Sequence, residues 1–250
     1  MTLRLASMIV TGARVLSRRL RTSGNPERAA IDPALMLRYV ARSIDPRGVM
    51  IDVGAGSGGG SRWMVEHAGL DPSHCYLIEA CPENFSRMAA QCPGYRNLNL
   101  AVAAQDGSVK LYTVDDPRWD GSSKSNTIYG AALRHKFPDK QVNEIEVPAR
   151  TLSSFYAEHG LDRVEFLWLN CEGAEYQLFG GDNSFLDRTR FVWIELHGAA
   201  PILRQFVAEK YRIYDLMMEH GFERVGGHRR DDIGATFGHL SYLFERFAWS

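Results

Sequence analysis

The stretch Met50–Ser61, MIDVGAGSGGGS, constrains the fold more than any other part of the chain. A short apolar run, one acid and then closely spaced glycines predict a strand, a tight turn and the start of a helix. Glycine lets the backbone turn with positive φ and leaves main-chain N–H groups open to a ligand. We therefore expect a nucleotide-type binding loop. It is not a P-loop, because no Lys-Ser or Lys-Thr pair follows the glycines.

Two classes of ligand fit this loop. Residues 54–59 match the GxGxxG pattern of dinucleotide-binding proteins, while Asp52 completes the D-x-G-x-G-x-G arrangement of S-adenosylmethionine enzymes. A carboxylate at this place can accept hydrogen bonds from the ammonium group of methionine, whereas it would repel a pyrophosphate. We favour S-adenosylmethionine, and a nicotinamide dinucleotide stays the alternative. The expected cofactor contacts in this stretch are Asp52, Gly54, Ala55, Gly56, Ser57 and Gly58.

Length and composition predict one globular domain with a short appendage. The chain has 250 residues, of which 45% are hydrophobic and 24% charged; this is enough for one substantial core. The formal net charge of −1 gives no broad attraction to nucleic acid. Its four cysteines form no CxxC pair, which favours reduced thiols and a cytoplasmic location.

Residues 1–31 are expected to form a basic amphipathic arm, and residues 32–250 the domain. The first 28 residues carry six arginines against one acid, with apolar residues on one helical face. Such a helix suits peripheral contact with a membrane, or packing on the domain. No run of eighteen apolar residues is present, so we expect no membrane span.

The glycine loop belongs to a predicted βαβ unit. A helix ending at Gly69 is followed by a buried strand at residues 75–78 and then by Glu79. Parallel pairing of this strand with residues 50–53 would bring Glu79, with its neighbour Ala80, close to a ribose bound over the loop.

Alternating helices and strands continue and predict a mainly parallel sheet. Further strands are expected at residues 98–103 and 108–114, an edge strand at 144–148, and an antiparallel pair at 222–225 and 240–247. The polar segment 115–126 is long for a connection and is a candidate substrate lid.

Polar residues follow two further apolar strands. Asn170 comes directly after residues 164–169, and Glu195 and His197 end the strand that begins at Phe191. Ligands of open α/β sheets bind at the carboxyl ends of strands. Glu195 and His197 are at i and i+2 and therefore point to the same side. Glu175, in contrast, is expected to be a solvated helical acid.

Together, the segments IDVGAGSGGGS, YLIEACPENF, TLSSF, FLWLNCEGAEYQLFGG and FVWIELHG resemble the FkbM family of S-adenosylmethionine-dependent methyltransferases. The likeness covers about residues 48–246. It implies an α/β, Rossmann-like class I methyltransferase fold with helices on both faces of a mostly parallel sheet. It also implies O-methylation of small molecules, often sugars of glycolipids, glycans or secondary metabolites. The family usually has an Asp at the position of Asn170, so a metal-binding or charge role at this position is open to question.

A sugar hydroxyl must lose a proton during methyl transfer. We assign His197 as the base and Glu195 as its orienting partner. Glu195 could instead bind the acceptor or, with Asn170, a divalent ion, and Asn170 is otherwise placed to hold the methionine end of the cofactor. The alternative functions are an NAD(P)-dependent oxidoreductase, although no Tyr is followed four residues later by Lys, and a non-catalytic binding protein. The acceptor is expected to be a small molecule, glycan or glycolipid; the oligomeric state is not predicted.

Overall fold

The structure is a computed structural model that describes residues 33–114, 126–197, 205–235 and 240–249. The predicted N-terminal arm, residues 1–31, and all but the last residue of the predicted lid lie outside these ranges. All four cysteines are free thiols. None of the helices within the described ranges is long and apolar enough to cross a bilayer.

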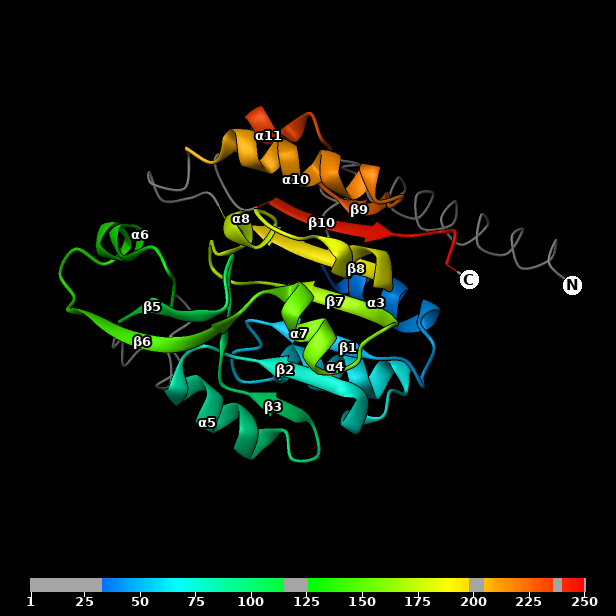
Figure 1. The fold of residues 1–250 in the computed structure, drawn as a ribbon, viewed down its shortest axis with the longest axis horizontal. Helices are drawn as coiled ribbons and strands as arrows, with labels where there is room; N and C mark the ends of the chain where they lie inside the picture. The colour runs from blue at the N-terminus through cyan, green and yellow to red at the C-terminus, as the bar shows by residue number, and fades with distance from the viewer. Residues whose placement is uncertain (1–32, 115–125, 198–204, 236–239, 250) are drawn as a thin grey trace, which may run out of the picture.

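A seven-stranded sheet forms the centre of the molecule (Figure 1). Its strand order is β3-β2-β1-β7-β8-β10-β9, in which only β10 runs against its neighbours. The mostly parallel sheet and the antiparallel C-terminal pair are therefore confirmed. The strands are β1 (Met50–Val53), β2 (Cys75–Ile78), β3 (Arg96–Leu98), β7 (Val164–Leu169), β8 (Thr189–Leu196), β9 (Glu223–Gly227) and β10 (Leu240–Glu245).

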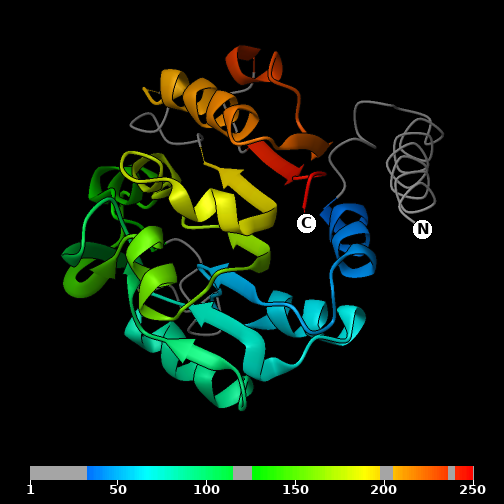
Figure 2. The same cartoon turned by 45° about the vertical axis from the view of Figure 1, so that its right-hand side comes forward.

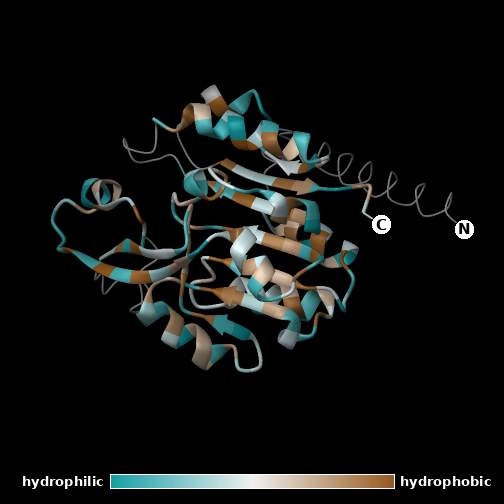
Figure 3. Cartoon of the chain, in the orientation of Figure 1, coloured by the Kyte–Doolittle hydropathy of each residue, from teal (hydrophilic) through white to brown (hydrophobic). Residues whose placement is uncertain are grey.

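Helices cover both faces of this sheet because its strands are apolar on both sides. Successive side chains of a strand point to opposite faces. Phe166 and Trp193 join one apolar cluster with the helices at residues 33–43 and 59–68, while Leu167 and Ile194 join the other with the helices at residues 152–158 and 207–219. Figure 2 shows helices on both sides of the sheet, and Figure 3 shows that several of its strands are largely hydrophobic. The helices are α3 (Pro33–Ser43), α4 (Gly59–Ala68), α5 (Pro82–Gln91), α6 (Gly130–Lys136), α7 (Leu152–Glu158), α8 (Glu175–Leu178), α10 (Val207–Glu219) and α11 (Asp232–Ala235), with short 3-10 turns at Pro72–His74 and Ser184–Arg188.

A second, three-stranded sheet stands beside the first and corrects three expectations. It has the order β4-β6-β5 and consists of β4 (Ala101–Val102), β5 (Gly107–Val114) and β6 (Val142–Arg150), with α6 between β5 and β6 in the chain (Figure 1). The predicted single strand 98–103 is thus two short strands in different sheets. Segment 108–114 pairs antiparallel with β6 and is not part of the parallel sheet, and the predicted edge strand 144–148 lies at the centre of the small sheet.

Asn99, which lies between β3 and β4, is one cause of the division of the predicted strand 98–103 into two. Its side-chain amide donates to the carbonyls of Glu79 and Ala80 at 2.9 and 3.1 Å. These bonds hold the chain where it leaves the main sheet, directly beside the end of β2.

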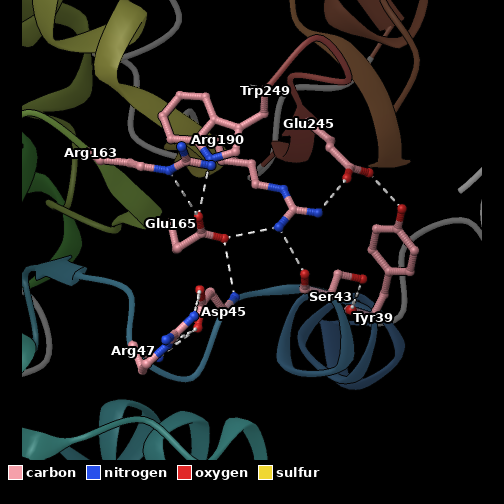
Figure 4. Close-up of polar contacts among 9 residues, drawn as sticks. All are labelled: Tyr39, Ser43, Asp45, Arg47, Arg163, Glu165, Arg190, Glu245 and Trp249. Atoms are coloured by element: carbon pink, nitrogen blue, oxygen red, sulfur yellow. Dashed lines mark hydrogen bonds and ion pairs between the residues drawn. The ribbon is translucent and has the colours of Figure 1, made fainter. Parts of the chain in front are cut away.

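A buried polar network fastens the sheet at the amino-terminal ends of its parallel strands (Figure 4). Arg190 of β8 donates to Glu165 of β7 at 2.9 Å and lies 3.5 Å from Glu245 at the end of β10. Tyr39 of α3 donates to the other oxygen of Glu245 at 2.6 Å, and Trp249 donates to Glu165 at 3.1 Å. The network joins α3, β7, β8 and β10 at the edge opposite to the one that carries the predicted site.

Candidate active site

The glycine loop forms the sharp turn between β1 and α4. Gly54 has a φ of 84°, and a Cβ on it would lie 1.9 Å from the carbonyl oxygen of Asn170. Gly58 is also left-handed, and a Cβ there would lie 2.4 Å from Sγ of Cys92. Any side chain at either position would therefore force the loop away from β7 or α5. The amides of Gly54 and Ala55 donate to the carbonyl of Ile78 at 2.9 and 3.1 Å and fix the loop to the end of β2.

A cavity of about 330 Å³ lies over this loop, at the carboxyl ends of β1, β2 and β7. This volume is at the lower end of the range for small-molecule sites. The small sheet closes one side through Ala101, Val102 and Leu111. The structure brings together most of the predicted cofactor contacts in the cavity wall, namely Gly54, Ala55, Gly56, Ser57, Glu79, Ala80 and Asn170.

Asp52 and Gly58, two further predicted contacts, do not line the cavity. Asp52 is 5% exposed, and its carboxylate accepts a hydrogen bond from the hydroxyl of Ser61 in α4. Burial raises the pKa of Asp52 to about 7, against the opposing effect of the Ser61 hydrogen bond. Asp52 therefore supports the loop from beneath, and its contact with the cofactor ammonium stays a prediction.

Glu79 is held on the loop by two backbone amides. One carboxylate oxygen accepts from Gly56 N and the other from Cys81 N, each at 2.9 Å. Burial raises the pKa of Glu79, while these amide donors lower it. The carboxylate is thus fixed in the cavity wall, in the place expected for an acceptor of ribose hydroxyls.

Asn170 supplies the test of whether a polar cofactor fits the cavity. Its backbone amide donates to the carbonyl of Val53 at 3.0 Å, which fixes the residue beside β1. Its side-chain oxygen is buried and accepts no hydrogen bond from the part of the chain that the structure describes. Since buried acceptors are almost always paired, this oxygen suits a donor on a ligand. Together with the acidic Glu79, it fits a molecule with hydroxyl and ammonium groups, as S-adenosylmethionine has.

His197 lies in a buried cluster with two carboxylates, one from the loop after β7 (Glu172) and one from the start of α8 (Glu175). Its Nδ1 is 3.2 Å from Glu175 and its Nε2 is 3.7 Å from Glu172. Glu175 is fully buried, and its carboxylate accepts from Cys171 N at 2.6 Å and Gly173 N at 2.9 Å. The expectation of a solvated Glu175 is therefore wrong, because the loop folds around its carboxylate.

The carboxylate that contacts the ring of His197 is also not the one expected. The contact between His197 and Glu195 runs through the backbone carbonyl of Glu195, at 3.2 Å from Nδ1, and the carboxylate against the ring is that of Glu175. Burial on its own would lower the pKa of His197, but the nearby carboxylates of Glu175, Glu172 and Glu195 outweigh it and raise the pKa to about 9. The ring is 3% exposed and does not line the cavity. His197 is therefore a buried imidazolium at neutral pH.

Glu172 is the member of this cluster that reaches the cavity. Its backbone has a φ of 50°, in the left-handed region that non-glycine residues rarely occupy. Thr127 donates to its carbonyl at 2.7 Å and so ties the small-sheet side of the cavity to this loop. Burial raises the pKa of Glu172, and the charge of His197 lowers it.

The sequence analysis gave no role to Thr127 or Ile128, which also line the cavity. No local pattern pointed to them, because they approach the site through an isolated bridge between Thr127 and Tyr112. Glu172 was visible within the segment EGAE, yet its left-handed backbone was not. No group of three or more His, Cys, Asp or Glu side chains suited to a metal ion occurs within the described ranges. Metal binding by Asn170 together with Glu195 stays a prediction.

Comparison with known proteins gives a family. The model of the methyltransferase FkbM domain matches residues 52–224. A search of curated proteins gave no match. Among solved structures, the chain is similar to the methyltransferase FkbM from Methylobacillus flagellatus, with 10% identity, a TM-score of 0.49 and coverage of 94% of this chain and 58% of the other. The chain thus spans somewhat over half the length of that protein.

A second similar structure is TrmK of M. capricolum in complex with S-adenosylhomocysteine, with 8% identity, a TM-score of 0.43 and coverage of 88% and 71%. The family match is the decisive comparison because it extends over more than half of the chain, from Asp52 at the end of β1 to Arg224 in β9. The chain belongs to the FkbM methyltransferase family.

Proposed function

We propose that this methyltransferase transfers the methyl group of S-adenosylmethionine to a hydroxyl of a small molecule, and that the acceptor is a sugar in a glycolipid, glycan or secondary metabolite. The observation that carries the proposal is Glu172, a partly buried carboxylate in the cavity wall with the buried His197 3.7 Å behind it. A carboxylate placed in this way can take the proton that a hydroxyl loses.

The chain offers suitable groups for each part of the cofactor. Glu79 can accept hydrogen bonds from the ribose hydroxyls, and Asn170 can accept one from the ammonium end. Open space beside Gly56 lets a ligand approach the backbone there. When bound, S-adenosylmethionine supplies an electrophilic methyl group on a sulfonium. The contribution of the protein is to align the hydroxyl with that methyl and to exclude water.

Glu172 is the proton acceptor that the geometry favours. His197 in its charged form stabilises the carboxylate of Glu172, so Glu172 can accept a proton at neutral pH. His197 as base and Glu195 as its partner stay a prediction, which requires the imidazole to be neutral and therefore a pH above about 9. The two assignments differ in their pH profiles. With His197 as base, activity rises as pH rises through about 9 and His197 loses its proton; with Glu172 as base, no such rise is expected.

The proposed partner is a small glycan or glycolipid. Nucleic acid is not proposed, since the net charge of −1 gives no general attraction to it. A cytoplasmic location and peripheral contact of the N-terminal arm with a membrane are part of the same proposal and rest on the sequence alone. The family match favours methyl transfer over the hydride-transfer alternative, and an activity measurement separates an enzyme from a non-catalytic binding protein.

The test is methyl transfer from labelled S-adenosylmethionine to glycan and lipid extracts, followed by mass spectrometry for a gain of one CH2 unit on oxygen. Glu172→Gln should lower turnover about 10²- to 10⁴-fold, the usual contribution of a positioned base, and leave the affinity for S-adenosylhomocysteine nearly unchanged. Glu66→Gln, at an exposed position of α4, is the matched control. Methylation at nitrogen or carbon only, or no cofactor-dependent labelling at all, would contradict the proposal.

A further inference from the structure

Asn126 is a second asparagine, besides Asn170, that brings unpaired side-chain polar atoms to the cavity wall. It lies at the start of the described segment that follows β5 and lines the same cavity as Glu172. Both its side-chain oxygen and its side-chain nitrogen are buried and have no hydrogen-bond partner among the residues that the structure describes. A buried amide is almost always paired, and leaving both of its ends unpaired is unfavourable, so such an amide calls for a ligand.

Thr127, the neighbour of Asn126 in the chain, connects this segment to Glu172. Thr127 donates to the carbonyl of Glu172 at 2.7 Å, and its backbone exchanges two hydrogen bonds with Tyr112 of β5, at 2.8 and 3.1 Å. Thr127 is therefore fixed between the small sheet and the loop after β7. Asn126 is the adjacent residue, with successive Cα atoms only about 3.8 Å apart, and it lines the same cavity as Glu172.

We infer that Asn126 recognises the acceptor, and that the acceptor presents a vicinal diol. The inference rests on the proposed function, in which Glu172 receives the proton of the reacting hydroxyl. The neighbouring hydroxyl of the diol donates to Oδ1 of Asn126, while Nδ2 donates to an oxygen of the same molecule. An amide offers one acceptor and two donors in one plane, and a hydroxyl both donates and accepts, so two adjacent hydroxyls satisfy the carboxylate and the amide together.

This arrangement gives selectivity as well as affinity. A site whose buried polar groups are paired by substrate hydroxyls rejects an analogue that lacks one of them, because the amide would then stay unpaired. The inferred substrate class is therefore a saturated polyol ring such as a pyranose, and simple alcohols are excluded.

The experiment uses the full chain loaded with S-adenosylhomocysteine, and saturation-transfer NMR with a panel of methyl hexopyranosides and with cyclohexanol. Asn126→Leu is the test variant, since leucine fills a similar volume without polar atoms. Asn183→Leu is the control, because Asn183 also has an unpaired side-chain oxygen but does not line the cavity. Calorimetry measures the affinity of each variant for S-adenosylhomocysteine.

We expect at least one hexopyranoside to receive saturation from the wild-type protein and from Asn183→Leu, and cyclohexanol to receive none. Asn126→Leu should bind that glycoside roughly 5- to 150-fold more weakly, as for the loss of two hydrogen bonds. Its affinity for S-adenosylhomocysteine should stay within about 2-fold, and its melting temperature should equal or exceed that of the wild type, because an unpaired buried amide has been replaced by an apolar group.

Three results would overturn the inference while leaving the proposed function intact. Weaker binding of S-adenosylhomocysteine to Asn126→Leu would place Asn126 in the cofactor site. Unchanged glycoside binding would remove it from recognition, and the absence of any glycoside signal would exclude the diol. In contrast, wild-type protein that does not bind S-adenosylhomocysteine would contradict the proposed function itself.

Discussion

Replacing His197 by Gln should destabilise the protein in a way that depends on pH. The pKa of His197 is about 9 in the folded protein, against an ordinary value of 6.5. A difference of about 2.5 pKa units corresponds to roughly 3 kcal/mol in the free energy of unfolding. Because the folded pKa is raised, this contribution is fully present below about pH 6.5 and is lost as pH rises through about 9.

The assay is urea unfolding of wild type and His197→Gln at about pH 6, 7.5 and 9.5, monitored by circular dichroism. The stability difference between the two proteins should shrink by roughly 3 kcal/mol from the lowest to the highest pH, and any loss of packing adds a constant offset. His220→Gln is the control, since His220 pairs with the exposed Asp187 at 2.9 Å and its replacement should change stability little. A difference that is constant across this pH range would show that the imidazole of His197 is neutral, and would refute the charge assignment.

Two further predictions concern the cofactor and the buried network. Glu79→Ala should weaken S-adenosylhomocysteine binding about 10- to 150-fold, since hydrogen bonds to a charged group contribute about 1.5–3 kcal/mol. Calorimetry on the folded variant measures this affinity, and an unchanged Kd would place Glu79 away from the ribose. Arg190→Met should lower the free energy of unfolding by about 3–5 kcal/mol in urea titrations, because it leaves the buried carboxylates of Glu165 and Glu245 without their shared cation. Arg47→Met, whose side chain is 89% exposed, should have little effect, and equal losses in the two variants would argue against a role for the network.

The sequence predicted the central sheet well because its signals are local. The apolar strands at residues 50–53, 75–78 and 164–169 and the glycine turn each follow from a few neighbouring residues. Parallel strands of one sheet end at the same edge, so the convergence of Glu79 and Asn170 on the glycine loop followed from these strands alone.

The small sheet and the His197 cluster depend on contacts that are distant in the chain. The alternation in segment 108–114 indicates a strand, but nothing in it specifies that Val109 faces Val147. Likewise, whether Glu175 is solvated depends on the amides of Cys171 and Gly173 turning toward its carboxylate, which requires the left-handed backbone of Glu172. The charge state of His197 follows from these contacts and was not visible in the segment FVWIELHG.

The position of β10 between β8 and β9 bears on how the protein is synthesised. β8 and β9 are synthesised before β10, yet they do not pair with each other in the finished sheet. Each of them pairs with β10, which follows both in the chain. Until β10 pairs, the nascent chain presents the unpaired edge of the apolar strand β8, which is an opportunity for association with other chains or with chaperones. Insertion of β10 also delivers Glu245 to Arg190 and Tyr39. Pairing of β10 thus joins β8 to β9 and adds Glu245 to the buried charge network in one step.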